Sequence, residues 1–179
     1  MRRFFIWTGT LTAAAVSVFG QRVPQLGHQN DPRLALLRNF FLAFHSPVSH
    51  LAPEFVAAAD RHGLDWRLLP SISVVESGGG KNAARNNIFG WASAKHGFPS
   101  IRSSIDWVAS RLAHSKRYQY KGLDGILATY NPRAGYPARV RSVMQRIAPD
   151  QTAGALYSLG ALINPASELQ QPALPAPAP

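Results

Sequence analysis

Apolar residues recur three and four positions apart along most of the central part of the chain. This spacing is typical of helices that bury one face, and no segment alternates apolar and polar residues for long enough to predict a strand. The sequence therefore predicts a mainly α fold. The expected helices cover residues 32–46, 52–62, 66–77, 97–115, 123–131 and 136–147.

Local signals fix several of the expected helix ends. Asp31 is a suitable N-cap for the first helix, and Pro32 is tolerated in its first turn. Gly63 is a stop signal for the second helix, and Asp65 is a candidate N-cap for the third. Pro70 lies inside the third helix, where it removes a backbone donor. We therefore expect that helix to begin late or to be kinked.

The composition changes towards both ends of the chain. Residues 1–20 contain two arginines, an apolar run and small residues, which is the layout of a secretory signal, with an uncleaved membrane anchor as the alternative. Residues 21–44 are expected to form a disordered linker and the first helix, and residues 45–150 the folded domain. Residues 151–179 end in a Pro/Ala-rich run and are expected to be a flexible tail. The protein is thus expected to be exported to the periplasm or cell envelope.

The net charge of +10 and the absence of cysteine narrow the possible functions. Without cysteine the protein has neither a disulfide nor a thiol nucleophile. The excess of positive charge indicates an anionic partner, and for an exported protein anionic envelope polymers or lipid head groups are nearer than nucleic acid. The alternative is ordinary solubility charge. Nucleic-acid binding would rest on charge alone, so no nucleic-acid partner is expected.

The segment VVESGGGKNAARNNIFGW, residues 74–91, permits two interpretations. A phosphate-binding loop requires G-x-x-x-x-G-K-[ST], but Val75 stands at the first glycine position and Asn82 follows the lysine. Glu76 is the better candidate for chemistry, because it shares a helix face with Leu69 and Ile72. A carboxylate on an apolar face is costly to ionise, which suits a general acid. The alternative is a half-exposed glutamate at a helix end with no chemical task.

Motifs follow Glu76 in a characteristic order. An apolar helix ends in Glu-Ser, a glycine-rich turn follows, an Asn-Ile-Phe-Gly segment comes next, and a later helix carries Tyr-Asn. This order, over residues 53–147, resembles the lysozyme-like peptidoglycan glycosidases. The likeness is to bacterial glucosaminidase domains (mannosyl-glycoprotein endo-β-N-acetylglucosaminidase-like) and, more loosely, to soluble lytic transglycosylases. The matching residues are Glu76-Ser77, Gly78–Lys81, Asn87–Gly90 and Tyr130-Asn131.

The resemblance implies a lysozyme-like helical domain that cleaves peptidoglycan glycan strands, without a metal or organic cofactor. The protein is expected to be a monomer. It assigns Glu76 as the general acid and places Tyr130 across the groove from it. The glycine turn would let the backbone approach a glycan strand closely. The side chains expected to contact the substrate are Ser77, Asn87, Phe89, Trp91 and Asn131.

The second catalytic group is less clear from the sequence. Asp106 and Asp124 are the only acidic residues between Glu76 and Asp150, and Asp124 also suits a helix N-cap. If neither faces Glu76, the N-acetyl group of the substrate could assist the reaction, as it does in some glycosidases. The transglycosylases carry Gly-Leu-Met-Gln where this chain has Ile-Phe-Gly-Trp, which favours the glucosaminidase branch. The alternative function is a non-catalytic glycan-binding module of the same fold.

Overall fold

The computed structural model describes residues 31–163, so the expected signal sequence lies outside the described residues. Within this range the chain is mainly helical, as the sequence predicts, and contains no strand apart from one isolated bridge. None of the helices in this range has the length and apolar character needed to cross a bilayer. The helices are α1 (Pro32–Ala43), the 3₁₀ helix η2 (Ser49–Leu51), α2 (Ala52–His62), α3 (Leu68–Ser77), α4 (Ile101–His114), α5 (Leu123–Tyr130), α6 (Tyr136–Ile147) and α7 (Asp150–Ile163).

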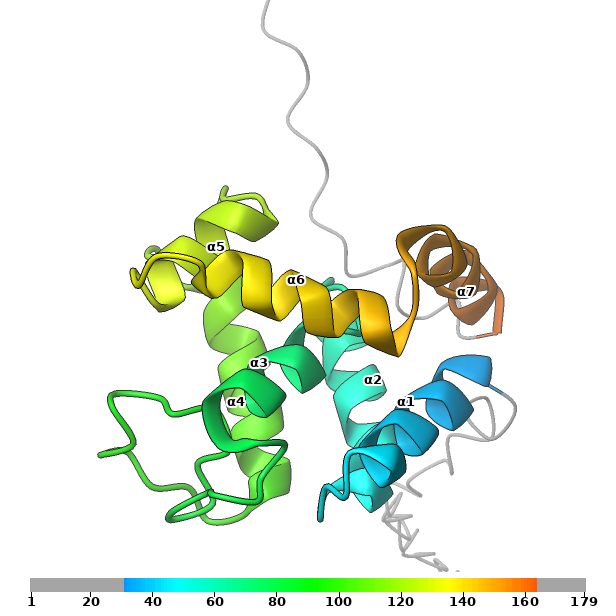
Figure 1. The fold of residues 1–179 in the computed structure, drawn as a ribbon. Helices are drawn as coiled ribbons and strands as arrows, with labels where there is room; N and C mark the ends of the chain where they lie inside the picture. The colour runs from blue at the N-terminus through cyan, green and yellow to red at the C-terminus, as the bar shows by residue number, and fades with distance from the viewer. Residues whose placement is uncertain (1–30, 164–179) are drawn as a thin grey trace, which may run out of the picture.

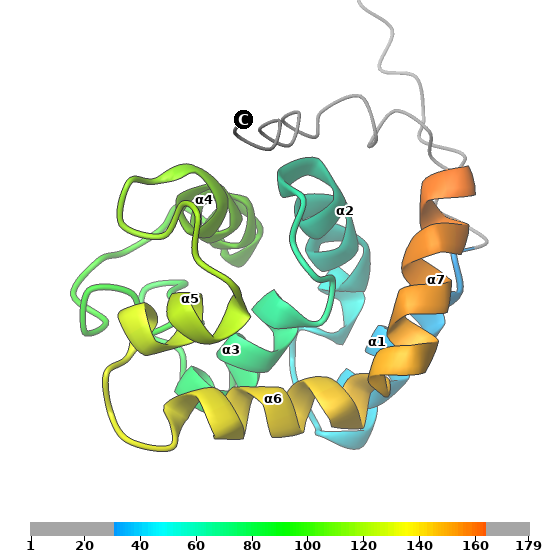
Figure 2. The same ribbon diagram turned by 90° about the horizontal axis from the view of Figure 1, so that it is seen from above.

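Helix α3 occupies the middle of the molecule. In both ribbon views the other helices surround it, and α6 lies along one side of it (Figures 1 and 2). Every residue from Leu68 to Val74 is buried, so α3 is enclosed on all faces rather than along a single stripe. Ser73 lies within this buried run and satisfies its hydroxyl by donating to the Pro70 carbonyl, 2.7 Å away. Glu76 lies in the last turn, where the helix emerges from the core.

The sequence predicts that Pro70 either delays the start of the third helix or kinks it, and the structure shows a late start. Helix α3 begins at Leu68, so Pro70 falls in the first turn, where a backbone N–H would have no intrahelical acceptor. Asp65 is not the N-cap of this helix. Its carboxylate accepts from the Arg67 N–H at 2.9 Å and pairs with the Arg67 guanidinium, which closes the turn before α3.

Helix α1, which the sequence predicts as a helix ahead of the 45–150 domain, belongs to the folded unit. Leu37 and Phe41 are wholly buried in the core. Arg33 is also buried, and its guanidinium pairs with Asp31 at 2.6 Å and with Asp60 of α2 at 2.7 Å. Asp31 additionally caps α1 by accepting the Arg33 N–H, so its predicted capping role is confirmed. The ion triad ties α1 to α2.

Residues 151–163, which the sequence assigns to a flexible tail, form most of α7. Ala153 is buried, and Arg67 donates to the Ala148 carbonyl at 2.7 Å and pairs with Asp150 at 2.9 Å. The hydrogen bond from Arg67 lowers the pKa of the Asp150 carboxyl. The start of α7 is therefore fixed to the turn before α3.

A histidine pair joins α2 to α4. His62 Nδ1 lies 3.1 Å from His114 Nε2, and His62 Nε2 lies 3.3 Å from Asp106, which also pairs with Arg61. Burial lowers the pKa of His62, and it outweighs the opposite effect of Asp106, while the neighbouring His114 and Arg61 act in the same direction as burial. The folded protein thus favours neutral His62.

This lowered pKa predicts a loss of stability in mild acid. Because the unfolded chain binds the His62 proton more readily, the stabilisation is complete above the unfolded pKa of about 6.5. It is lost as the pH falls through the lower folded pKa. Urea unfolding from pH 8 to pH 5 should show a steeper decline for the wild type than for His62→Gln. Parallel declines for the two proteins would contradict this expectation.

Candidate functional site

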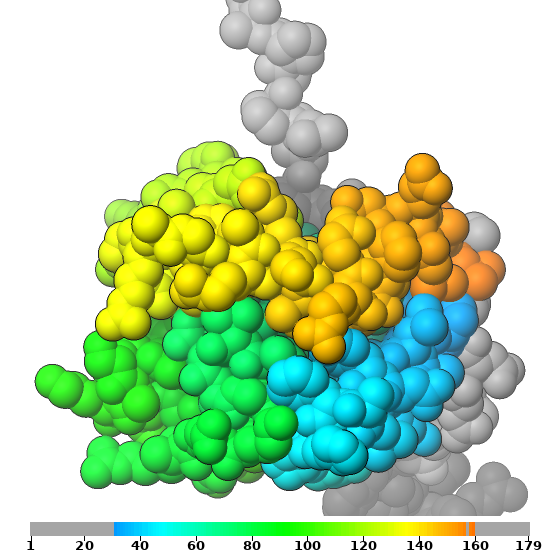
Figure 3. Space-filling model, in the orientation of Figure 1, coloured from blue at the N-terminus to red at the C-terminus, as the bar shows by residue number. Residues whose placement is uncertain are grey.

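A pocket of about 620 Å³ lies beside the last turn of α3. Its walls come from the end of α3, from the start of the segment after Phe89, from the connection before α5 and from the end of α5. In the space-filling view the green connection between α3 and α4 projects from the molecule below the yellow α6 (Figure 3). The lining residues with polar or aromatic side chains include Glu76, Trp91, Arg117, Tyr118, Tyr130 and Asn131.

The carboxylate of Glu76 packs against the backbone of Gly90. A Cβ atom on Gly90 would lie 2.6 Å from Glu76 Oε2, and Gly90 has a positive φ of 61°. Only glycine combines this backbone conformation with room for the carboxylate. The sequence places Gly90 in the Asn-Ile-Phe-Gly motif, but its contact with Glu76 is visible only in three dimensions.

Two tyrosines lie near the Glu76 carboxylate. The Tyr130 hydroxyl donates to the Phe89 carbonyl. Burial raises the pKa of Tyr130 well above its ordinary value, and the nearby Glu76 charge raises it further. Tyr136 is wholly buried, and the same two causes raise its pKa. Its hydroxyl lies near enough to Glu76 for the carboxylate charge to raise its pKa. Within residues 31–163, however, the hydroxyl makes no hydrogen bond of good geometry. Both phenols are therefore neutral near pH 7.

Ser77 and the glycines after it form a turn that packs against protein. Ser77 Oγ donates to the Ile88 carbonyl at 2.7 Å and accepts from the Gly80 N–H at 3.0 Å. A Cβ atom on Gly79 would lie 2.9 Å from the Ser46 hydroxyl. The sequence predicts that these glycines let the backbone approach a glycan strand. In the structure, Gly79 instead lets it approach Ser46. Ser77 is buried and does not line the pocket.

Asn87 and Phe89 also support the pocket from behind. The Asn87 side chain accepts from the Trp91 N–H at 3.0 Å and donates to the carbonyls of Trp91 and His96, at 3.0 and 2.8 Å. Asn87 is 2% exposed, and Phe89 is wholly buried in the core. Substrate contacts are predicted for both side chains. In the structure, the Asn87 side chain instead holds the loop by hydrogen bonds, and the Phe89 ring packs in the core.

Trp91 and Asn131, for which substrate contacts are also predicted, line the pocket. The Trp91 ring lies edge-on to Tyr130 and Trp107, with ring centroids 5.7 and 5.1 Å apart. Asn131 follows the last residue of α5, and its side chain accepts from the Arg133 N–H at 3.1 Å. The pocket therefore has an aromatic wall and a polar rim.

The wall beyond Trp91 contains an unusual backbone. Ala92, Ser93 and Ala94 are three consecutive non-glycine residues with left-handed φ angles of 53°, 56° and 60°. Each costs about 1–2 kcal/mol relative to an ordinary conformation. Hydrogen bonds from the Ala94 N–H to the carbonyls of Gly90 and Trp91 hold the turn. Such strain often accompanies functional sites.

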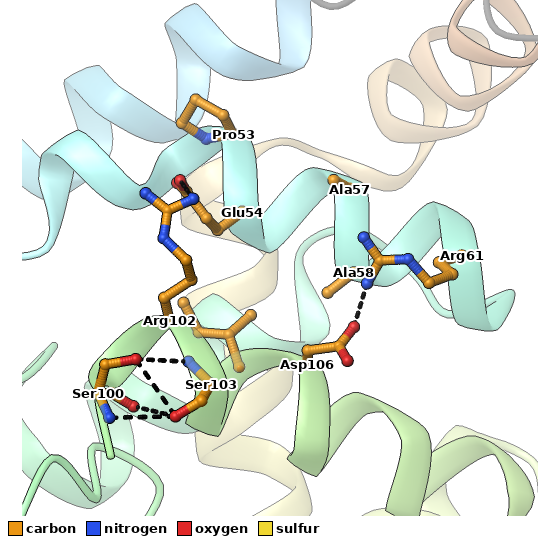
Figure 4. A pocket seen from close by; sticks show the side chains of 10 residues that line it. Pro53, Glu54, Ala57, Ala58, Arg61, Ser100, Arg102, Ser103 and Asp106 are labelled. Carbon is orange, nitrogen blue, oxygen red and sulfur yellow. Dashed lines mark hydrogen bonds and ion pairs between the residues drawn. The ribbon is translucent and has the colours of Figure 1, made fainter. Parts of the chain in front are cut away.

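The two candidate second carboxylates lie outside this pocket. Asp106 turns towards Arg61 in a separate pocket of about 660 Å³ between α2 and α4 (Figure 4). Asp124 lies in the first turn of α5, not at its N-cap, and pairs with Arg141. Of the described residues that line the first pocket, Glu76 is the only acidic one.

Comparison with known proteins leaves the family open. No protein-family model matches the chain, no curated protein matches it, and no solved structure matches it. Within residues 31–163 no three His, Cys, Asp or Glu side chains gather as they would around a metal ion. The geometry of the Glu76 pocket is therefore the basis for a functional proposal.

The contact between Gly90 and Glu76 can be tested with a matched pair of variants. Gly63 has a similar φ of 64° but nothing within 4 Å of an added Cβ. Gly90→Ala and Gly63→Ala should each lower the free energy of unfolding by about 1 kcal/mol, because both force alanine into the left-handed region. Only Gly90→Ala should also displace the Glu76 carboxylate, because its new Cβ atom would lie 2.6 Å from Glu76 Oε2. Crystal structures of the two variants check this, and an undisplaced Glu76 carboxylate in Gly90→Ala would contradict the contact.

Proposed function

We propose that this protein is an exported peptidoglycan glycosidase that cleaves β-1,4 bonds between N-acetylglucosamine and N-acetylmuramic acid, with Glu76 as general acid and base. The observation that carries the proposal is one carboxylate, at the end of a buried helix, in a pocket with an aromatic wall. Aromatic faces suit sugar rings, and a single positioned carboxyl group suits proton transfer to a glycosidic oxygen. The motif order around Glu76 supports the same function.

The mechanism follows from the lack of a second acid among the described lining residues. Glu76 gives its proton to the glycosidic oxygen as the bond from that oxygen to the anomeric carbon breaks. The carbonyl oxygen of the substrate's own N-acetyl group bonds to the anomeric carbon from the opposite face. The Glu76 carboxylate then takes a proton from the incoming hydroxyl, whose oxygen bonds to the anomeric carbon as the bond to the N-acetyl oxygen breaks. Water as that hydroxyl gives hydrolysis, and the C6 hydroxyl of the muramyl sugar gives a 1,6-anhydro end.

Tyr130 has a supporting part in this scheme. Its proton is engaged by the Phe89 carbonyl, so the hydroxyl oxygen offers only acceptor lone pairs to the pocket. These lone pairs can stabilise positive charge at the anomeric carbon. The raised pKa of Tyr130 keeps the hydroxyl neutral, so no competing anion forms beside Glu76.

Mass spectrometry of the soluble products tests the proposal. The full chain and Glu76→Gln are each incubated with purified peptidoglycan. Products with reducing N-acetylglucosamine ends would identify a glucosaminidase, and 1,6-anhydro-muramyl ends a lytic transglycosylase. Loss of either product in Glu76→Gln supports the acid role.

A glycan-binding module is the second candidate. It is favoured by the same absence of a second acid and by the engagement of the Tyr130 hydroxyl within the protein. This function predicts that the wild type and Glu76→Gln both sediment with peptidoglycan and that neither releases product. That result would overturn the glycosidase proposal.

A further inference from the structure

The connection between α4 and α5, residues 115–122, displays a tyrosine with no structural role. Tyr120 is 98% exposed, so its ring packs against nothing in the described chain. Its backbone is nevertheless left-handed, with a φ of 63°. A bulky residue is rare in this conformation, and glycine or asparagine would occupy it at lower cost. Strain without a compensating contact points to a function for the side chain.

The connection around Tyr120 is firmly held. Tyr118 is buried and anchors the connection. The Arg117 guanidinium donates to the Thr129 carbonyl at 3.2 Å, and Lys121 Nζ donates to the Thr129 hydroxyl at 2.7 Å. Both contacts fasten the connection to α5. The exposed ring is thus presented from a fixed base.

The same connection is continuous with the Glu76 pocket. Arg117 and Tyr118 belong to the pocket lining, and Tyr120 follows Tyr118 by only two residues along the chain. Lys116, Arg117 and Lys121 add three positive charges, and the sequence has no acidic residue between Asp106 and Asp124. Asp124 is paired with Arg141. An aromatic ring beside unneutralised cations fits a polymer that combines sugar rings with carboxylates.

We propose that residues 115–122 form an extended subsite that holds a carboxylate-bearing glycan strand where it runs beyond the Glu76 pocket. Tyr120 stacks on a sugar ring of the strand, and Lys116 and Lys121 attract its carboxylates. The identity of the glycan rests on the proposed function. The subsite makes affinity depend on strand length, because a short fragment that fills the pocket does not reach Tyr120.

Sedimentation of the full chain with purified peptidoglycan tests the subsite. Tyr120→Ala and Tyr120→Gly should bind roughly five- to tenfold more weakly than the wild type, as expected for the loss of one stacking contact. Tyr120→Trp should retain binding. Leu42→Ala removes a side chain that is 55% exposed on α1 and should bind like the wild type. Equal binding by all of these proteins would overturn the proposal.

Thermal unfolding separates a binding role from a structural one. Tyr120→Gly should unfold at a higher temperature than Tyr120→Ala, because glycine relieves the left-handed strain. If Tyr120→Gly, the more stable of the two variants, still binds more weakly than the wild type, loss of the fold cannot explain the weaker binding. If binding instead follows thermal stability across the variants, Tyr120 is structural and the proposal fails.

Two further comparisons identify the ligand and separate this proposal from the glycosidase function. Chitin particles carry N-acetylglucosamine rings without carboxylates, so the wild type should bind them more weakly than peptidoglycan. Equal binding to both would show that Lys116 and Lys121 do not attract carboxylates of the strand. Release of product by a wild type whose binding does not depend on Tyr120 would overturn the subsite alone. Binding that depends on Tyr120 without any product would overturn the glycosidase and leave the subsite standing.

Discussion

Glu76→Gln is expected to lower product release from peptidoglycan by about 10²- to 10⁴-fold, the usual contribution of a general acid. Glutamine matches glutamate in shape and keeps the contact with Gly90, but it has no acidic proton to give. The fold should persist, since Glu76 lies at the pocket and not in the core. Product release by mass spectrometry and thermal unfolding of the same samples check both statements.

The matched control for this experiment is Asp124→Asn. It removes one negative charge from an exposed position that pairs with Arg141 and does not line the Glu76 pocket. This variant should release product at the wild-type rate. Inactivity of Asp124→Asn would overturn the mechanism with a single carboxylate.

Arg33→Met should produce the largest loss of stability. The Arg33 side chain is 1% exposed and lies between the carboxylates of Asp31 and Asp60, whose side chains are 3% and 9% exposed. Methionine keeps much of the volume but leaves both carboxylates buried without their cation. Breaking a buried ion pair in this way costs about 3–5 kcal/mol.

Urea unfolding measures this cost, with Arg38→Met as the control. Arg38 is exposed on the same helix, so its replacement should change the free energy of unfolding by less than about 0.5 kcal/mol. A similar small change for Arg33→Met would show that α1 is not held by the ion triad.

The helices were largely predictable because apolar spacing and capping residues are local properties. Asp31 and Gly63 mark helix ends in the sequence and in the structure. The start of α3 was ambiguous, because a proline is compatible with either a kink or a first-turn position. Helix α7 escaped prediction because the Pro/Ala-rich run that begins after it dominates the composition of that end of the chain.

The site was predictable only in part. Glu76, Trp91, Tyr130 and Asn131 do share one pocket. A motif does not reveal, however, which of its side chains bond to the protein's own backbone, so substrate contacts were assigned to residues that brace the loop. Contacts between distant parts of the chain were also hidden from the sequence. Arg117 and Tyr136 were missed for this reason, and so was the contact of Gly90 with Glu76.

The hydrogen bond between Tyr130 and the Phe89 carbonyl has a consequence for how substrate arrives. It fastens α5 to the segment on the other side of the pocket, and Asn87 holds the same segment at Trp91 and His96. This hydrogen bond opposes any separation of the two walls. For the proposed glycosidase this means a groove that is already shaped when a glycan strand arrives, so binding and release would depend on diffusion and on contacts along the strand rather than on a hinge.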